Sequence, residues 1–549
     1  MEIYGVENLS FKYAGDEHKV LEDISFSVQK GEFVTFCGAS GSGKTTLLRM
    51  LKPLIAPKGE ISGNIFFNGS DILKLSQREQ AFRIGFVMQE AEEQIVTDKV
   101  WHELAFGLEN LGVESSKIWL KISEAASFFG MDNWFNSDIS RLSGGMKQIL
   151  NLASVMAMSP EVIILDEPTG QLDPVSASEF MAALFRLNRD LGITVIMSEH
   201  RLEEALPLSD RLIVLENGKI IANSTPEKVG RELFLNGSKV FLSMTSSMRI
   251  AAMLGADSLP VSIREGKEFI RSLAGGSRLI SKAKPVYKEK KEELSVSVEN
   301  IWFRYEKNGA NVLKGVYFKA YKGKISAVLG GNGAGKTTLL SVISGIYKPF
   351  YGNVFIGGNN IKKNISSVGM LPQNPRLVFA ESKIGDDIKD ILMDKGFSEQ
   401  EAIEKTRDAL KLCGAEDIYE KHPFDVSGGE AQKAALSKLL AMDFETIIMD
   451  EPTKCLDSDF KASFGNILLK LKDEKKTIII VSHDIEFCAV YADRLSFLFD
   501  GRIVSEGNPL EFFTQNMFYT TAASKISRGI IENAVTTEDI IDAFGKHGN

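Results

Sequence analysis

The chain has 549 residues, of which 44% are hydrophobic and 25% are charged, a composition that is ordinary for soluble globular proteins. Its net charge of −9 at pH 7 argues against broad binding to nucleic acid, which needs extended basic surfaces. No segment approaches the ~20 consecutive apolar residues that cross a bilayer, so work at a membrane would need a membrane-bound partner.

The first half of the chain alternates predicted strands and helices around a glycine-rich loop. Alternating apolar residues around 11–13 and 24–28 predict an antiparallel sheet, and the run 33–37 predicts a buried strand leading into the loop. A helix is expected at 45–51, directly after the loop. Further strands and helices then alternate, at 162–165, 176–190, 194–197 and 211–215. This order predicts a parallel α/β core, and the stretch 107–158 predicts a helical subdomain.

The second half repeats this plan from residue 294, after a segment of different composition. Residues 236–278 have amphipathic helical patches, and 281–293 form a charged, proline-containing run that is typical of a solvated linker. We therefore expect four parts, which are a first domain, a connecting segment, a second domain and a C-terminal tail. Their predicted ranges are 1–235, 236–293, 294–525 and 526–549.

The cysteines predict neither a disulfide framework nor a zinc or iron–sulfur site. They are far apart and form no Cys-x-x-Cys pair, which is typical of buried or incidental thiols in a reducing compartment. The four are Cys37, Cys413, Cys455 and Cys488.

Short motifs recur in the same order in the two halves. The loop Gly-Ala-Ser-Gly-Ser-Gly-Lys-Thr at 38–45 returns as Gly-Gly-Asn-Gly-Ala-Gly-Lys-Thr at 330–337. Ser-Gly-Gly at 143–145 and Asp-Glu-Pro-Thr at 166–169 both return 284 residues later, and a histidine returns after 283 residues. A repeat of this length predicts two complete modules in one chain.

Both glycine loops lie between a predicted strand and a predicted helix, where backbone amides and the helix N-terminus can surround phosphates. Lys44 and Lys336 would neutralise the β- and γ-phosphates, while Thr45 and Thr337 would ligate Mg²⁺. We expect nucleotide contacts from both loops and the threonine after each. These residues are Gly38, Ala39, Ser40, Gly41, Ser42, Gly43, Lys44, Thr45, Thr46, Gly330, Gly331, Asn332, Gly333, Ala334, Gly335, Lys336, Thr337 and Thr338.

Carboxylates follow an apolar predicted strand in each half. Asp166 and Asp450 end these strands at the sheet edge, where bound Mg²⁺ would lie. Glu167 and Glu451 come next and are placed to polarise a water for attack on the γ-phosphate. An isolated Asp-Glu pair would equally fit a surface turn, but the accompanying motifs favour catalysis.

Two further pairs of side chains follow predicted strands. His200 and His483 could contact the γ-phosphate and hold the attacking water. Gln89 and Gln373 end shorter strands, and their carbonyls could ligate Mg²⁺. The glutamine-containing arm is shorter in the second half, with 37 residues between its loop lysine and Gln373 against 45 in the first.

The remaining candidates would bind the base and the phosphates. Tyr13 and Tyr305 end the first strands and could stack on adenine, although packing at a strand end is the simpler alternative. The Ser-Gly-Gly motifs open helices, whose N-terminal amides suit an anion. Because each half already has its own glycine loop, we expect each motif to serve the nucleotide of the other half. These residues are Ser143, Gly144, Gly145, Ser427, Gly428 and Gly429.

Together these motifs resemble the ATP-binding cassette (ABC) ATPases, whose Walker A loop, Gln loop, signature, Walker B, D-loop and His switch they match in order. The resemblance covers nearly the whole of each copy. It implies two P-loop NTPase-type domains, each with a parallel α/β core, an antiparallel β subdomain and a helical signature subdomain. It also implies an intramolecular head-to-tail cassette dimer that hydrolyses two ATP molecules with Mg²⁺. Asp173 and Asp457 match the D-loop, whereas Val426 and the segment 454–457 depart from the usual pattern.

Finer details resemble the fused ATPase subunit of energy-coupling factor (ECF) importers, which take up vitamins and metal ions. The similar segments are 94–96, 104–112, 198–204, 518–523 and 528–529. This resemblance implies a transmembrane coupling protein, a small membrane substrate-binding protein and a peripheral position on the cytoplasmic face of the cell membrane. It also places the docking surface at about 94–112 and 376–394.

Two alternatives remain open. A soluble tandem cassette acting on ribosomes or DNA would need features that the sequence lacks, such as an N-terminal cysteine cluster or a long basic helical linker. A fused sugar-importer ATPase usually has one degraded site, and here both sites keep their lysine, glutamate and histidine.

Overall fold

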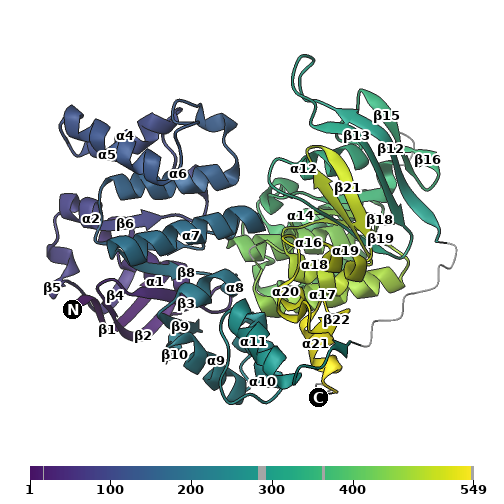
Figure 1. Cartoon of the computed structure of the whole chain (residues 1–549). Helices are drawn as coiled ribbons and strands as arrows, with labels where there is room; N and C mark the ends of the chain where they lie inside the picture. Colours follow the sequence, from purple (N-terminus) through teal and green to yellow (C-terminus); the bar gives the residue numbers. More distant parts are fainter. Residues whose placement is uncertain (17, 282–291, 362–364, 455, 546–549) are drawn as a thin grey trace. The chain divides into compact units, whose positions relative to one another are not determined.

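The computed structural model describes residues 1–16, 18–281, 292–361, 365–454 and 456–545. Within it the chain forms two compact units, Met1–Phe269 and Ile270–Asn549 (Figure 1). Most of the predicted charged linker, residues 282–291, and Cys455 lie outside the described residues. The predicted boundaries after 235, 293 and 525 stay predictions.

The first unit contains two sheets with a shared core. The antiparallel sheet has the order β2-β1-β4-β5, and the larger sheet has the order β10-β9-β3-β8-β7-β6. The antiparallel strands are β1 (Glu2–Tyr13), β2 (Leu21–Gln29), β4 (Gly59–Phe67) and β5 (Ser70–Asp71). The larger sheet comprises β3 (Phe33–Cys37), β6 (Ile84–Val87), β7 (Val162–Asp166), β8 (Thr194–Ser198), β9 (Arg211–Glu216) and β10 (Lys219–Ser224).

The order of the larger sheet brings three chemically important strand ends together. Strands β3, β7 and β8 are adjacent and parallel, so their carboxyl ends meet at one edge. Every residue of these three strands is buried, as expected for continuous apolar runs covered on both faces. The predicted parallel α/β core is thus confirmed.

Helices cover the sheet and build a separate helical subdomain. Helix α1 (Lys44–Met50) follows the glycine loop, and α7 (Pro174–Leu191) packs on the other face. Helix α7 begins two residues before the predicted start, because the Asp173 carboxylate caps it and Pro174 fits its first turn. Figure 1 shows α4, α5 and α6 grouped on one side of this unit. The subdomain helices are α3 (Ala91–Gln94), α4 (Val100–Asn110), α5 (Ser115–Phe128) and α6 (Gly144–Ala157), whereas α2 (Gln77–Arg83) packs beside β6 of the larger sheet.

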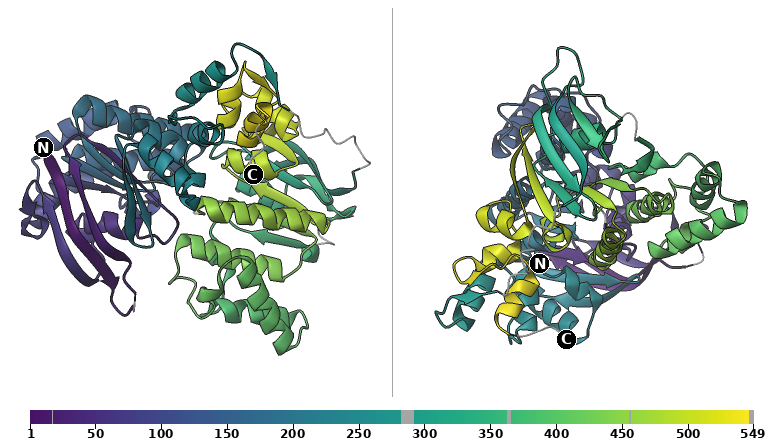
Figure 2. Two further views of the ribbon diagram at one scale, coloured as in Figure 1. Left: turned by 90° about the horizontal axis from the view of Figure 1, so that it is seen from below. Right: turned by 90° about the vertical axis from the view of Figure 1, so that its right-hand side faces the viewer.

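The second unit repeats both sheets in the same spatial order. Its antiparallel sheet is β13-β12-β15-β16 and its larger sheet is β17-β18-β19-β14-β20-β21. In Figure 2 the teal antiparallel strands stand beside the yellow hairpin of β20 and β21. The strands are β12 (Leu294–Phe303), β13 (Leu313–Tyr321), β14 (Ile325–Leu329), β15 (Tyr351–Ile356), β16 (Asn359–Asn360), β17 (Val368–Leu371), β18 (Thr446–Asp450), β19 (Thr477–Val481), β20 (Arg494–Phe499) and β21 (Arg502–Gly507).

The helices of the second unit also follow the plan of the first. The helix after its glycine loop is α12, and its signature helix α16 has 14 residues, as does α6. They are α12 (Lys336–Ile343), α14 (Ile384–Asp394), α15 (Glu399–Leu412), α16 (Gly428–Ala441), α17 (Ser458–Asp473), α18 (Ile485–Tyr491) and α19 (Pro509–Gln515).

The segments between and after the repeats are folded where they are described. Residues 226–273 form α9 (Pro226–Leu235), α10 (Ser246–Met253) and α11 (Ile263–Leu273). In the second unit, β11 (Leu279–Ile280) pairs in parallel with β22 (Ile531–Glu532), between α20 (Ala522–Ser527) and α21 (Thr537–Ala543). No helix within the described ranges is long and apolar enough to span a bilayer.

Candidate ATP sites

The two glycine loops have backbone conformations that only glycine accommodates at key points. Gly38 and Gly330 have φ values of 150° and 157°, and a Cβ there would lie 2.0 and 2.3 Å from a carbonyl oxygen of the neighbouring strand. Lys44 folds back on its loop and donates to the carbonyls of Gly38 and Ala39 at 2.9 Å. Lys336 makes the corresponding contacts at 2.9 and 3.0 Å. The lysine ammonium groups therefore lie inside the loops, where phosphates would bind.

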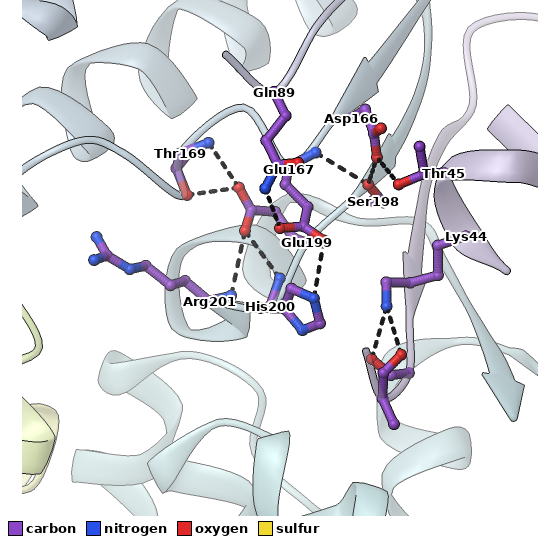
Figure 3. A network of polar contacts seen from close by, with 12 residues as sticks. Lys44, Thr45, Gln89, Asp166, Glu167, Thr169, Ser198, Glu199, His200 and Arg201 are labelled. Atoms are coloured by element: carbon purple, nitrogen blue, oxygen red, sulfur yellow. Dashed lines mark hydrogen bonds and ion pairs between the residues drawn. The ribbon is translucent and has the colours of Figure 1, made fainter. Parts of the chain in front are cut away.

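The Asp166 carboxylate lies at the end of β7 beside the first glycine loop. Its Oδ1 accepts hydrogen bonds from the hydroxyls of Thr45 at 3.0 Å and Ser198 at 2.8 Å (Figure 3). Burial, together with the charge of Glu167, raises the pKa of Asp166. A bound divalent cation would instead lower the pKa of Asp166, because its charge stabilises the carboxylate. Carboxylate and hydroxyl oxygens are ligands that Mg²⁺ prefers.

The corresponding Asp450 is held differently. Both of its carboxylate oxygens are buried and have no hydrogen-bond partner among the described residues. Burial raises the pKa of Asp450, and the positive charge of Lys336 offsets part of this effect. Because buried oxygens of this kind normally have partners, Asp450 fits a cation ligand.

Glu167 is the centre of a side-chain network in the first site. Its Oε2 accepts from Gln89 Nε2 and its Oε1 lies beside His200 Nε2, both at 2.9 Å (Figure 3). Burial alone would raise the pKa of Glu167, but the His200 ring and the Lys44 charge outweigh it, so the pKa is lowered. The residue has φ 44°, and its backbone N–H donates to the Ser198 hydroxyl at 3.0 Å. A non-glycine residue in this region is typical of functional sites.

The second site brings the matching residues together, but the contacts among them differ from those in the first site. Glu451 has φ 52°, and its Oε1 lies 3.2 Å from His483 Nε2. The same ring nitrogen is 3.2 Å from Lys336 Nζ. Glu451 Oε2 also accepts from the backbone N–H of His483 at 3.0 Å. Gln373 follows β17, at the place that Gln89 holds after β6.

The two predicted adenine-stacking tyrosines lie at matching positions beside the loop helices. The Tyr13 hydroxyl is 2.9 Å from Thr46 Oγ1, and the Tyr305 hydroxyl is 2.8 Å from Thr338 Oγ1. Tyr305 also packs edge-on against Phe303. Both rings are therefore tied to the first turn of α1 or α12, and stacking on adenine stays a prediction.

Each signature motif caps a helix. Ser143 caps α6 by accepting from Met146 N, and Gly144 and Gly145 form the first turn. Ser427 caps α16 in a reciprocal capping box with Glu430. The serine hydroxyls therefore lie at helix N-termini, as the anion-binding prediction requires. Pairing of each signature with the other copy's loop stays a prediction.

Sequence reasoning missed three residues that organise the first site, which are Thr169, Ser198 and Glu199. The Glu199 carboxylate is 1% exposed and joins the turn after β7 to the loop after β8 (Figure 3). A signal was present in the repeat, because the residue before the histidine is Glu199 in one copy and Ser482 in the other.

Comparisons with known proteins identify the family of the chain. The ABC transporter family matches residues 21–170 and 313–454, so both repeats carry the domain. The chain belongs to this family and is a tandem-cassette ABC ATPase.

Its relatives match nearly the whole chain. A candidate ABC transporter ATP-binding protein of Bacillus cereus is 38% identical over 544 residues, covering 98% of this chain and 97% of that protein. One from Methanosarcina mazei is 31% identical, covering 92% and 89% respectively. Among solved structures, the archaeal ribosome recycling factor aABCE1, in complex with the ribosomal stalk protein aP1, has a TM-score of 0.59. It is 20% identical and covers 92% of this chain and 91% of its own, a likeness that supports the fold alone.

Proposed function

We propose that the chain is the energy-coupling ATPase of a membrane transporter, of the ECF type that imports a vitamin or metal ion. Its partners would be a transmembrane coupling protein and a small membrane substrate-binding protein, which would hold it on the cytoplasmic face. The proposal rests mainly on a series of contacts in the first unit that leads from the Glu167 carboxylate to an exposed apolar surface.

The series begins at the Gln loop. Gln89 donates to Glu167, as described above, and directly follows Met88. The Gln94 side chain makes two hydrogen bonds to the backbone at the end of β6. Its Oε1 accepts from Met88 N at 2.9 Å, and its Nε2 donates to Phe86 O at 3.2 Å. A change at the γ-phosphate that moves Gln89 would therefore pull on the segment that starts at Gln94.

The next link connects this segment to α4. The Glu103 carboxylate on α4 is buried and accepts from Val96 N at 3.1 Å and Thr97 N at 2.8 Å. Since these contacts are charge-assisted, α4 and the segment should move together.

The series ends on an aromatic surface of α4 and α5. The rings of Trp101 and Trp119 are stacked, with their centroids 5.8 Å apart, and the centroid of the Phe135 ring lies 6.5 Å from that of Trp119. Trp119 and its neighbour Leu120 are 53% and 70% exposed. Adjoining exposed apolar side chains of this kind are typical of protein–protein contact sites, so we assign docking to 94–112 and the adjoining α5.

The second unit offers a related but chemically different surface. Asp387 on α14 holds the segment after Gln373 by accepting from Ala380 N and Glu381 N. Exposed apolar residues of this segment include Leu377 and Met393. We assign docking to 376–394 as well, and the difference between the two surfaces fits a partner with two unlike contact sites.

The proposed chemistry is in-line hydrolysis at each site. Bound Mg²⁺ supplies charge neutralisation at the phosphates and would be held by Thr45, Gln89 and Asp166, or by Thr337, Gln373 and Asp450. Glu167 or Glu451 accepts a proton from the attacking water while the water oxygen bonds to the γ-phosphorus. The bond to the bridging oxygen breaks and its electron pair leaves with ADP. His200 and His483 hold the water and the γ-phosphate.

Photo-crosslinking tests the docking assignment. A photoreactive amino acid replaces Trp119 or Leu377, and Leu73, which is also strongly exposed, serves as the matched control. After irradiation of native membranes, we expect the first two positions to capture a polytopic membrane protein and the control to capture none. Capture of no membrane protein, or equal capture by all three positions, would contradict the proposal.

A further inference from the structure

The first cassette contains a buried carboxylate that the second lacks. Glu199 follows β8 directly and lies beside His200. Its Oε1 accepts from Thr169 N at 2.9 Å and from the Thr169 hydroxyl at 2.6 Å. Its Oε2 accepts from the backbone N–H groups of His200 at 3.0 Å and Arg201 at 3.2 Å. Four donors thus converge on one side chain.

This arrangement fastens together the two chain segments that carry the catalytic groups. Thr169 belongs to the turn that starts with Glu167, and Glu199 attaches this turn to the loop that carries His200. The guanidinium of Arg201 adds a further connection by donating to Leu172 O at 2.9 Å. Buried, fully satisfied networks of this kind hold their members in one geometry.

The second cassette has Ser482 at the same position and a different arrangement around its base. The Ser482 hydroxyl is 3.1 Å from Thr453 Oγ1 and accepts from Asp484 N at 3.0 Å. The backbone N–H of His483 donates instead to Glu451, at 3.0 Å. The proposed base of this copy therefore accepts a hydrogen bond from its own histidine loop.

The two copies differ in the groups that contact the carboxylate of the proposed base, Glu167 or Glu451. In the first copy, the backbone N–H of His200 donates to Glu199. The carboxylate of Glu167 instead contacts the side chains of Gln89 and His200. Side chains can rotate away when ATP and water enter, whereas a backbone N–H is fixed in its loop. A hydrogen bond from such a group also makes a carboxylate a weaker proton acceptor.

We propose that Glu199 is a positioning residue, which accepts the hydrogen bond of the His200 backbone N–H and so prevents that group from donating to Glu167. As a result, the first site hydrolyses ATP faster than the second. This inference deepens the proposed hydrolysis and rests on Glu167 acting as the base. It does not depend on the transport partner.

The purified full chain tests the inference by vanadate trapping with photoreactive 8-azido-ATP and Mg²⁺, followed by mass spectrometry of labelled peptides from each cassette. The ratio of first-cassette to second-cassette label reports which site hydrolyses more often, even when the sites are coupled. In the native protein we expect an excess in the first cassette. Equal labelling would overturn the inference.

The variant Glu199→Gln keeps the side-chain shape but cannot accept from both segments. We expect the label ratio to fall about tenfold, since hydrogen bonds to charged groups have effects of this size. Binding of azido-ATP without hydrolysis should stay within about twofold in both cassettes, which separates positioning from simple loss of the site. An unchanged ratio, or a parallel loss in both cassettes, would overturn the inference.

Two further variants complete the experiment. Glu161→Gln makes the same chemical change at the opposite end of β7, where Glu161 contacts Arg83, and should leave the ratio unchanged. Glu167→Gln should abolish trapping in the first cassette. If it does not, the assignment of the base fails; if it does and Glu199→Gln has no effect, only the positioning inference fails.

Discussion

Removal of the Asp387 carboxylate should destabilise the second unit far more than the matching change destabilises the first. Asp387 on α14 and Lys438 on α16 form an ion pair whose side chains are only 3% and 10% exposed. Asp387 also accepts from Ala380 N at 2.7 Å and Glu381 N at 3.1 Å, and Lys438 donates to Val378 O. The variant Asp387→Ala would leave a buried ammonium without its counter-charge, which costs about 3–5 kcal/mol.

The first unit provides the matched control. Glu103 occupies the position of Asp387 and accepts from two backbone amides, but Ser154 stands where Lys438 would be. Glu103→Ala therefore leaves no buried cation and should cost about 1–3 kcal/mol. Replacing both charges, as Asp387→Leu with Lys438→Met, should restore the part of the loss that comes from the unpaired ammonium, while the amides of Ala380 and Glu381 stay without their acceptor.

Urea unfolding followed by circular dichroism measures the free energy, and hydrogen exchange with mass spectrometry assigns the change to a unit, because two units need not unfold in one step. Faster exchange in Asp387→Ala should concentrate at 378–394. A cost for Asp387→Ala no greater than that for Glu103→Ala, or no recovery in the double variant, would refute the reasoning.

Three other predictions follow from the sites and the buried groups. Glu167→Gln with Glu451→Gln should lower ATP hydrolysis at least about 100-fold while ATP binding persists, and normal turnover would overturn both base assignments. Burial lowers the pKa of Lys52 to about 8 from 10.5, so the unfolded chain binds more protons between these pH values and the free energy of unfolding should rise with pH there. Urea unfolding at pH 7.5 and 10 measures this increase in the free energy of unfolding. The variant Lys52→Met should abolish the increase, and an unchanged increase would contradict the role of Lys52. Burial also raises the pKa of the described thiols, so the native protein should resist iodoacetamide at pH 8 until denatured, and rapid alkylation would contradict this. These thiols are Cys37, Cys413 and Cys488.

The sequence was sufficient for the order of the elements and for the motif-bearing ends of the strands. Apolar runs of about five residues alternate with helical patterns, and the polar motifs follow them directly, so Asp166 and His200 were expected at one sheet edge. Of the two alternatives for the cysteines, buried or incidental thiols, the three described cysteines follow the first, because all three are free and buried.

Contacts between distant segments could not be read in the same way. The bonds from Glu199 to Thr169 and from Asp387 to Lys438 join residues 30 and 51 positions apart. No local pattern encodes these pairs, because they depend on which strands and helices become neighbours. Likewise, the short pairing of β11 with β22, which anchors the end of the described chain, joins segments about 250 residues apart and has too few residues for a periodic signal.

The most direct test of the central claim is affinity purification of this chain from detergent-solubilised native membranes, with mass spectrometry of the proteins that accompany it. We expect a polytopic membrane protein in constant proportion, together with a small hydrophobic binding protein whose identity would indicate the solute. Recovery with ribosomes or soluble complexes alone would leave the tandem ATPase intact and contradict its assignment to a transporter.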